Sequence, residues 1–144
     1  MKFNGLWRLC DDGILRPAIA GEVLASDGQW LKAWFLIDTD ADRTVISADI
    51  LQRLGISGDA PRFELAGVGG MARSVVVDTK IRLKSESNAN ATFEGKFAAL
   101  SDAKILEMSV LGRDITNLFA VIVDRPQDVV CLLAPQHRYV IVSP

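Results

Sequence analysis

The sequence predicts an all-β domain with one or two short helices. Short runs of valine, isoleucine, leucine and phenylalanine recur along the chain, and turn-forming residues separate them, which is typical of strands. The chain has 144 residues, of which 49% are hydrophobic and 24% charged, the length and composition of one folded domain. It contains no internal repeat, low-complexity segment or linker, so we expect residues 1–144 to form a single domain.

The first two strands are expected to form a hairpin. The run Ile14–Ala25 contains a proline and a glycine, and we interpret it as an edge strand or a bent strand. Ser26–Gln29 is a predicted hairpin turn, because its Asp-Gly pair supplies the positive φ that such turns need. Trp30–Ile37 then returns as the second strand. Its last part, Ala33–Ile37, is apolar without alternation, so we expect it to be buried on both faces.

A short helix is predicted at Ser47–Leu54, with Ser47 as the N-cap and Gly55 as the stop. Arg62–Leu83 is a second β region that glycines interrupt between Gly67 and Gly70, as at the tip of a hairpin. Ser85–Thr92 is polar and predicts a surface turn. The remaining predicted elements are a short helix at Asp114–Phe119 and strands at Phe93–Leu100, Ile105–Leu111, Val121–Val123, Val129–Leu133 and Tyr139–Val142.

Charge and composition exclude several classes of function. The net charge of −2 does not favour binding to nucleic acid or to an anionic membrane. Two cysteines, Cys10 and Cys131, are too few for a disulfide scaffold, and we expect reduced thiols. His137 is the sole histidine, which argues against histidine triads and histidine-rich zinc sites. The start of the chain lacks the apolar run of a signal peptide, so we expect a cytoplasmic protein.

Asp38 directly follows the apolar strand that ends at Ile37. An unpaired carboxylate in apolar surroundings loses its hydration, so proteins keep one there when it is paired, bound to a metal or catalytic. The simplest alternative is a carboxylate that caps or stabilises a turn. Asp38 is therefore the first candidate for a functional residue.

The segment Leu36–Ile46, LIDTDADRTVI, resembles the catalytic loop of the retropepsins, the retroviral-type aspartic proteases. The nine positions that follow the family pattern are Leu36–Thr39, Ala41, Asp42 and Thr44–Ile46. Val110–Asp114, VLGRD, is similar to the second family element, an apolar pair followed by Gly-Arg-Asp or Gly-Arg-Asn at the start of a short helix. Between them, the glycine-containing stretch Phe63–Val77 occupies the place of the family's β-hairpin flap. The resemblance covers about Ala18 to Val123 and implies a closed, retropepsin-like β-barrel.

The resemblance also implies an aspartic endopeptidase that acts on extended peptides or proteins as a homodimer. Hydrolysis by this route uses two carboxylates that share one proton, one acting as base on a water molecule and the other as acid. The chain has one such motif, so Asp38 would meet its counterpart from a second copy on the two-fold axis. The chemistry needs no cofactor and no metal.

Other residues receive roles from the same resemblance. Thr39 would hydrogen-bond across the axis, and Arg113 would pair with Asp42, which would also help to hold the substrate backbone. The terminal strands commonly build the dimer interface in this family, which makes Tyr139–Val142 and the N-terminal residues candidates. The flap tip, which would close over the peptide and exclude water, comprises Val68, Gly69 and Gly70.

Asp40 departs from the family pattern, which has glycine at this position. A third carboxylate about 4 Å from the dyad would cost up to ~4 kcal/mol at an effective dielectric constant of 20. It would raise the proton affinity of the dyad and could narrow the cleft. The alternative function is therefore a catalytically inactive dimer of the same fold that binds peptides.

A calcium-binding loop is a third interpretation of the same stretch. Asp38–Asp49, DTDADRTVISAD, places carboxylates at loop positions 1, 3, 5 and 12 of the EF-hand pattern. Position 6 is Arg43, where the sharp turn requires glycine, and the preceding residues favour a strand over a helix. The sequence therefore favours the protease interpretation over this one.

Overall fold

The computed structural model describes residues 1–56, 64–67, 70–102, 106–135 and 140–144, and only the backbone of 64–67 and 70–72. Within these ranges the chain is built from strands and two short helices, as the sequence predicts. The helices are α1 (Ala48–Leu54) and α2 (Arg113–Thr116). The strands are β1 (Lys2–Asn4), β2 (Leu6–Leu9), β3 (Leu15–Leu24), β4 (Trp30–Ile37), β5 (Val45–Ile46), β6 (Glu64–Gly67), β7 (Gly70–Lys84), β8 (Asn90–Leu100), β9 (Ser109–Leu111), β10 (Ala120–Asp124) and β11 (Val129–Leu133).

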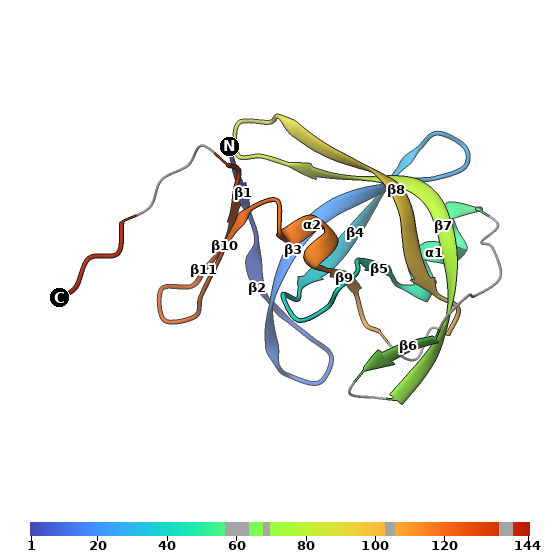
Figure 1. Ribbon diagram of the computed structural model, residues 1–144, viewed down its shortest axis with the longest axis horizontal. Coiled ribbons are helices and arrows are strands. Elements are labelled where there is room, and N and C mark those ends of the chain that lie inside the picture. Colours follow the sequence, from blue (N-terminus) through green and yellow to red (C-terminus); the bar gives the residue numbers. More distant parts are fainter. Residues whose placement is uncertain (57–63, 68–69, 103–105, 136–139) are drawn as a thin grey trace.

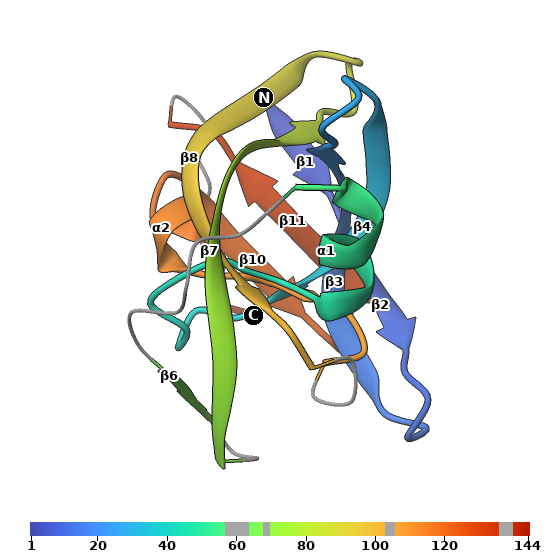
Figure 2. The same ribbon diagram turned by 90° about the vertical axis from the view of Figure 1, so that its right-hand side faces the viewer.

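The strands form two sheets. The larger sheet has the order β2-β3-β4-β9-β5-β8-β7-β6, and β3 also pairs with β7, so the sheet curls back on itself (Figures 1 and 2). The smaller sheet has the order β1-β11-β10 and lies at the end of the molecule where the C-terminal residues leave it (Figure 1). The main core between these strands and α1 contains Phe35, Ile46, Leu54 and Ile81, all 1% exposed or less.

The first hairpin forms as predicted, and one detail of it is corrected. β3 and β4 pair antiparallel from Ala18↔Leu36 to Leu24↔Trp30, and Gly28 in the turn has a φ of 85°. The interpretation of β3 as an edge strand is wrong, because β2 and β7 pair with its other side. Pro17 is tolerated within the sheet near one end of β3, opposite Trp7 of the short strand β2.

The apolar end of β4 is buried more on one face than on the other. Ala33, Phe35 and Ile37 point into the main core and are at most 6% exposed. Trp34 and Leu36 point to the opposite face and are partly buried against a smaller cluster of Cys10, Ala18 and Met108. The expectation of burial on both faces is therefore met only in part, because the covering layer on the second face is small.

Helix α1 has the predicted position, with Ser47 before it and Gly55 after it at a φ of 65°. The side chain of Ser47 does not cap the helix; its hydroxyl accepts a hydrogen bond of 3.4 Å from the hydroxyl of Ser109. No helix in the described ranges is long and apolar enough to cross a membrane.

The two chain ends differ from the sequence-based expectation. The N-terminal residues form β1 and β2, which were not predicted, because their pairing partners β11 and β3 lie elsewhere in the chain. The predicted C-terminal strand Tyr139–Val142 is wrong over residues 140–142, which form no strand here and are 81–87% exposed; Tyr139 and His137 lie outside the described residues.

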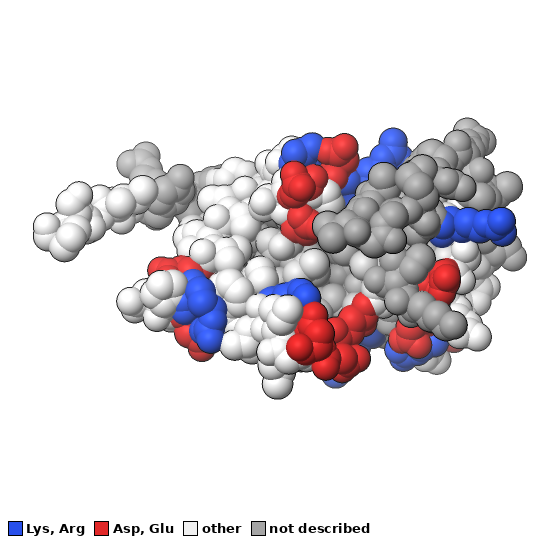
Figure 3. Space-filling model, turned by 90° about the horizontal axis from the view of Figure 1, so that it is seen from below, with Lys and Arg blue, Asp and Glu red and all other residues white. Residues whose placement is uncertain are grey.

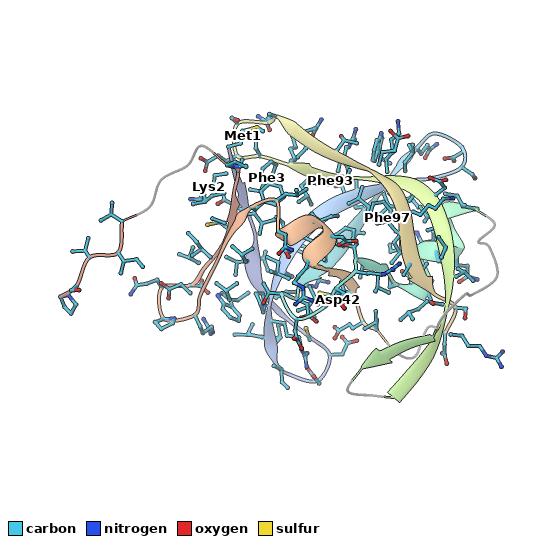
Figure 4. The ribbon with its side chains drawn as sticks, in the orientation of Figure 1. Met1, Lys2, Phe3, Asp42, Phe93 and Phe97 are labelled. Atoms are coloured by element: carbon cyan, nitrogen blue, oxygen red, sulfur yellow. The ribbon has the colours of Figure 1, made fainter. Side chains whose placement is uncertain are left out.

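Aromatic packing joins the smaller sheet to the larger one. The ring of Phe119, which follows α2, packs edge-on against Phe3 of β1 and Phe93 of β8, with centroid distances of 5.4 and 6.1 Å. Figure 4 shows Phe3 and Phe93 on the inner side of the strands that carry them. The buried ring of Phe3 and the partly buried rings of Phe93 and Phe119 hold the N-terminal strand against the larger sheet.

Candidate active site

Asp38 begins a loop that leaves the sheet at the end of β4 and re-enters it as β5. β9 lies between these two strands, parallel to β4 with Ile37 opposite Leu111, and antiparallel to β5 with Val45 opposite Val110. The backbone N–H of Asp38 donates to the carbonyl of Leu111 at 3.2 Å. Two sequence segments about 70 residues apart are thereby placed side by side, and these are the two segments that carry the predicted motifs.

Gly112 is required where the two segments meet. A Cβ atom at this position would lie 2.3 Å from the carbonyl carbon and 2.4 Å from the carbonyl oxygen of Arg43. Because backbone atoms cannot yield as a flexible side chain does, only glycine allows the loop to pack against the start of α2. Close packing is therefore sufficient to explain why the first position of the Gly-Arg-Asp element is glycine.

A buried hydroxyl and a carboxylate lock the loop to α2. Thr44 is fully buried, and its hydroxyl donates to Asp114 Oδ1 at 2.6 Å and accepts from the N–H of Gly112 at 3.1 Å. The backbone N–H of Thr44 also donates to the Asp114 carboxylate, at 2.9 and 3.0 Å. Hydrogen bonds to a charged group contribute roughly 1.5–3 kcal/mol each, so this cluster is a strong brace of the loop.

A second brace lies at the surface. The Arg113 guanidinium forms an ion pair with the Asp42 carboxylate, and the Arg113 N–H donates to the carbonyl of Ala41 at 2.8 Å. Figure 4 shows Asp42 in the loop below α2. Both side chains of the ion pair are largely exposed, so it contributes less to stability than the buried cluster around Thr44.

The Asp38 carboxylate is oriented by its own loop. Its Oδ1 accepts hydrogen bonds from the N–H groups of Asp40 at 3.0 Å and Ala41 at 3.3 Å. Within the described residues, Oδ2 accepts no hydrogen bond from this chain, and the side chain is half-buried. One oxygen is therefore fixed by the backbone, and the other is left for a partner, a water molecule or a substrate.

Asp40 fits the loop without backbone strain. Among the described residues, the non-glycine residues with a positive φ are Asn88 and Asp128, so the φ of Asp40 is negative. Its side chain is exposed, and its backbone N–H donates the hydrogen bond to Asp38 Oδ1. The aspartate in place of glycine therefore does not disturb the geometry around Asp38.

The acidic residues of the loop do not gather around a metal. β5 runs through the middle of the Asp38–Asp49 segment and pairs with β8 and β9, and Asp49 lies in the first turn of α1. No three His, Cys, Asp or Glu side chains come together to hold a metal in the described ranges. The calcium-loop interpretation is therefore wrong for this stretch, because the strand β4 precedes it where a helix is expected and its carboxylates do not converge.

The other candidate residues are placed as follows. Thr39 is exposed at the turn after Asp38. β6 and β7 form a hairpin at the place predicted for the flap, and Gly67 pairs with Gly70 in it; Val68 and Gly69 lie outside the described residues. Acidic side chains gather on the face seen from below in Figure 3, which is the face toward which the ends of the β2–β3 and β6–β7 hairpins point in Figure 1.

A family model described as aspartyl protease matches residues 23–115, which include both the Asp38 loop and the Gly112–Asp114 element. The chain belongs to the aspartyl protease family. No curated protein matches it significantly.

Solved structures place this aspartyl protease family member in the retropepsin fold. The structure titled EIAV protease complexed with the inhibitor HBY-793 is similar, with 22% identity and a TM-score of 0.51, over 71% of this chain and 86% of that chain. A retropepsin-like aspartic protease from Rickettsia conorii is similar with 17% identity and a TM-score of 0.51, over 92% of this chain and 88% of that chain. At these identities the likeness shows the fold.

Sequence reasoning missed the roles of two residues in this family member. Asp114 was noted only as part of the Gly-Arg-Asp element, and Thr44 only as part of the loop, yet buried Thr44 and exposed Asp114 together brace the loop. A threonine before two apolar residues carries no local sign of burial. A buried hydroxyl without a partner costs desolvation free energy, so the need for a nearby acceptor becomes evident only once the burial of Thr44 is known.

Proposed function

We propose that the chain is an aspartic endopeptidase in which two copies each contribute one Asp38 to a shared dyad. The observation that carries this proposal is the orientation of the Asp38 carboxylate, with Oδ1 held by two backbone N–H groups and Oδ2 free of partners in the described part of its own chain. A carboxylate held in this way is positioned to share a proton with a second carboxylate and to activate a water molecule.

One chain has one Asp38 motif, so the reaction requires a second copy. Apolar side chains available for an interface lie at the chain end, where Val140, Ile141 and Val142 are 81–87% exposed, and Val123 and Val129 of the smaller sheet are 43% and 36% exposed. Burial of a side chain of this size contributes roughly 1.5–3 kcal/mol. A symmetric dimer that covers these residues would bring two identical loops together on its axis.

The substrate of this proposal is an extended peptide. The β6–β7 hairpin would cover it, and its main-chain groups would pair with the strands that line the cleft. The Asp42 carboxylate, held by Arg113, would accept hydrogen bonds from the substrate backbone. Nucleic acid and membranes are not expected partners, and the proposed location remains the cytoplasm.

Cleavage of a peptide library tests the proposal. Full-length protein is assayed from about pH 3 to 7, the range in which carboxylate dyads share a proton, with and without pepstatin. We expect pepstatin-sensitive cleavage that falls at least about hundredfold in Asp38→Asn, because the general acid–base pair is lost. A dimer that cleaves nothing at any pH would contradict the proposal.

The alternative, an inactive dimer that binds peptides, is favoured by one feature, the exposed Asp40 carboxylate in the loop. Asp40→Gly separates the two functions. Since the φ of Asp40 is negative and its side chain has no partner in the described part of the chain, this substitution should leave the fold intact. Activity that appears only in Asp40→Gly would show that the natural chain is the inactive form.

A further inference from the structure

A cavity of about 760 Å³ lies away from the Asp38 loop. None of residues 38–44 lines it; its walls come from β2, β3, β4, α1, β7, β8 and the segment before β9. Figure 2 shows α1 and β4 together on the side that faces the viewer. The volume is within the range of roughly 300–1,000 Å³ that is typical of ligand sites in proteins.

The charge of this cavity is opposite to that of the whole protein. Its lining carries a net charge of +2, whereas the chain carries −2. The cationic residues are Arg8, Lys32, Arg53, Arg82 and Lys84, and the acidic residues are Glu22, Asp49 and Glu107. This lining therefore has a local excess of positive charge, whereas acidic and basic side chains lie side by side on the face shown in Figure 3.

Two of the cations are already engaged. Arg82 pairs with Glu22 at 2.5 Å and stacks on Trp30, with Cζ 4.0 Å from the ring centroid. Arg8 stacks on Trp34, with Cζ 4.6 Å from the ring centroid. These contacts hold both guanidinium groups in place and cover one face of each indole ring.

The other three cations make no ion pair within the part of the chain that the structure describes. Lys32, Arg53 and Lys84 are all exposed. Lys32 lies opposite Glu22 in the strand register, but the Glu22 carboxylate is engaged by Arg82. Three cations without an ion pair around one cavity of net positive charge favour an anionic ligand.

The remaining lining favours a peptide over a polynucleotide. Partly buried Trp34 and buried Ile50 and Met108 offer apolar surface for aliphatic side-chain stems. Asp49 and Glu107 would repel a continuous run of phosphates, and a net charge of +2 is small for a site that must neutralise several of them. Carboxylates spaced by peptide units suit the three separated cations better.

We propose that this cavity binds an acidic peptide segment, through Lys32, Arg53 and Lys84, with Trp34 in the same lining. In the proteolytic reaction it would act as an exosite that recruits substrates carrying an acidic segment outside the scissile sequence. That role rests on the proposed function, whereas peptide binding itself does not depend on catalysis.

Binding is tested with the full-length Asp38→Asn chain, so that no probe is cleaved. The probes are a fluorescein-labelled oligoglutamate peptide, the corresponding oligoglutamine peptide and oligo-dT, and the readout is fluorescence anisotropy. We expect oligoglutamate to bind, oligoglutamine not to bind, and the binding of oligoglutamate to weaken with added salt. Lys32→Gln/Lys84→Gln should weaken it about tenfold, as expected for the loss of two partly exposed ion pairs.

The matched control is Lys80→Gln/Lys96→Gln, which removes the same charge from β7 and β8 outside this cavity, where both lysines pair with acidic residues. It should bind as tightly as the parent. Equal binding by both double variants, no binding of oligoglutamate, or tighter binding of oligo-dT would each overturn the proposal. Because no arm measures cleavage, failure of the protease proposal would leave these results interpretable.

Discussion

At the scale of single residues, the Thr44–Asp114 cluster explains why the Asp38 loop has a fixed shape. A fully buried hydroxyl that both donates and accepts stabilises the loop only while its partners are present. The resemblance to retropepsins predicted the Asp42–Arg113 ion pair, which is present, but not this cluster. Its pairing depends on how β9 inserts between β4 and β5, which no local pattern reveals.

We predict that Asp114→Ala lowers the free energy of unfolding by about 2 kcal/mol, because Thr44 then keeps a buried donor without an acceptor. Asp114→Asn, which retains one acceptor oxygen, should lose less. Denaturant unfolding of these variants and of Thr44→Val measures the effect. In a double-mutant cycle, the Asp114→Ala and Thr44→Val losses should be smaller together than their sum; strict additivity would contradict the assignment.

The buried thiol of Cys131 should make the stability of the fold depend on pH. Burial raises the pKa of this thiol above its ordinary value of 9.0, and the side chain is 3% exposed. As the pH rises, the thiol therefore loses its proton in the unfolded chain at a lower pH than in the folded chain. The contribution of this thiol to the free energy of unfolding is present below about pH 9 and is lost as the pH rises further. Alkylation by iodoacetamide at pH 8 should be slow in the native protein and fast in guanidinium. Fast alkylation of native Cys131 would show that β11 is not packed as described.

At the scale of elements, the short helices and the hairpins follow from local signals, whereas the strand order does not. The Asp-Gly turn at Ser26–Gln29 and the helix between Ser47 and Gly55 were predictable because the residues that start and stop them adjoin them in sequence. β1 and β2 were missed because they are short and pair with distant strands. The Asp38 loop was recognised as a candidate catalytic loop from its sequence motif, and not from the pattern of hydrophobic residues.

Gly112 lies where the start of α2 closely approaches the backbone of Arg43. Gly112→Ala should destabilise the fold by about 3 kcal/mol, since its Cβ would overlap the backbone of Arg43 and force β9 and the loop apart. Gly95→Ala in β8 is the matched control, because a Cβ there meets no atom within 4 Å. Thermal unfolding should show a large decrease for the first variant and little change for the second. Similar melting temperatures would contradict the close approach.

At the scale of the whole molecule, the structure of one chain accounts for the fold but leaves exposed apolar side chains at one end. The C-terminal residues 140–142 are not a strand within the single chain, contrary to the expectation from their apolar composition. An isolated apolar segment gains little from extending into water, and the proposed dimer would supply a surface to cover it. The sequence could suggest that partner only through its resemblance to a dimeric family.

We therefore predict that removal of residues 136–144 weakens self-association. The full chain should sediment as a dimer and the truncated chain as a monomer, because the exposed apolar residues Val140, Ile141 and Val142 are lost. The truncated chain should keep the far-ultraviolet circular dichroism of the two sheets, since Val140, Ile141 and Val142 are 81–87% exposed. A truncated chain that remains fully dimeric would place the interface elsewhere.

The central claim is that one Asp38 from each of two copies forms a single catalytic dyad. It is tested most directly by a heterodimer of the natural chain and Asp38→Asn, isolated through different affinity tags and assayed on a cleaved peptide against the natural homodimer. The account predicts that the heterodimer loses activity by at least about hundredfold, because a dyad needs both carboxylates. A heterodimer that keeps half of the homodimer's activity would contradict it.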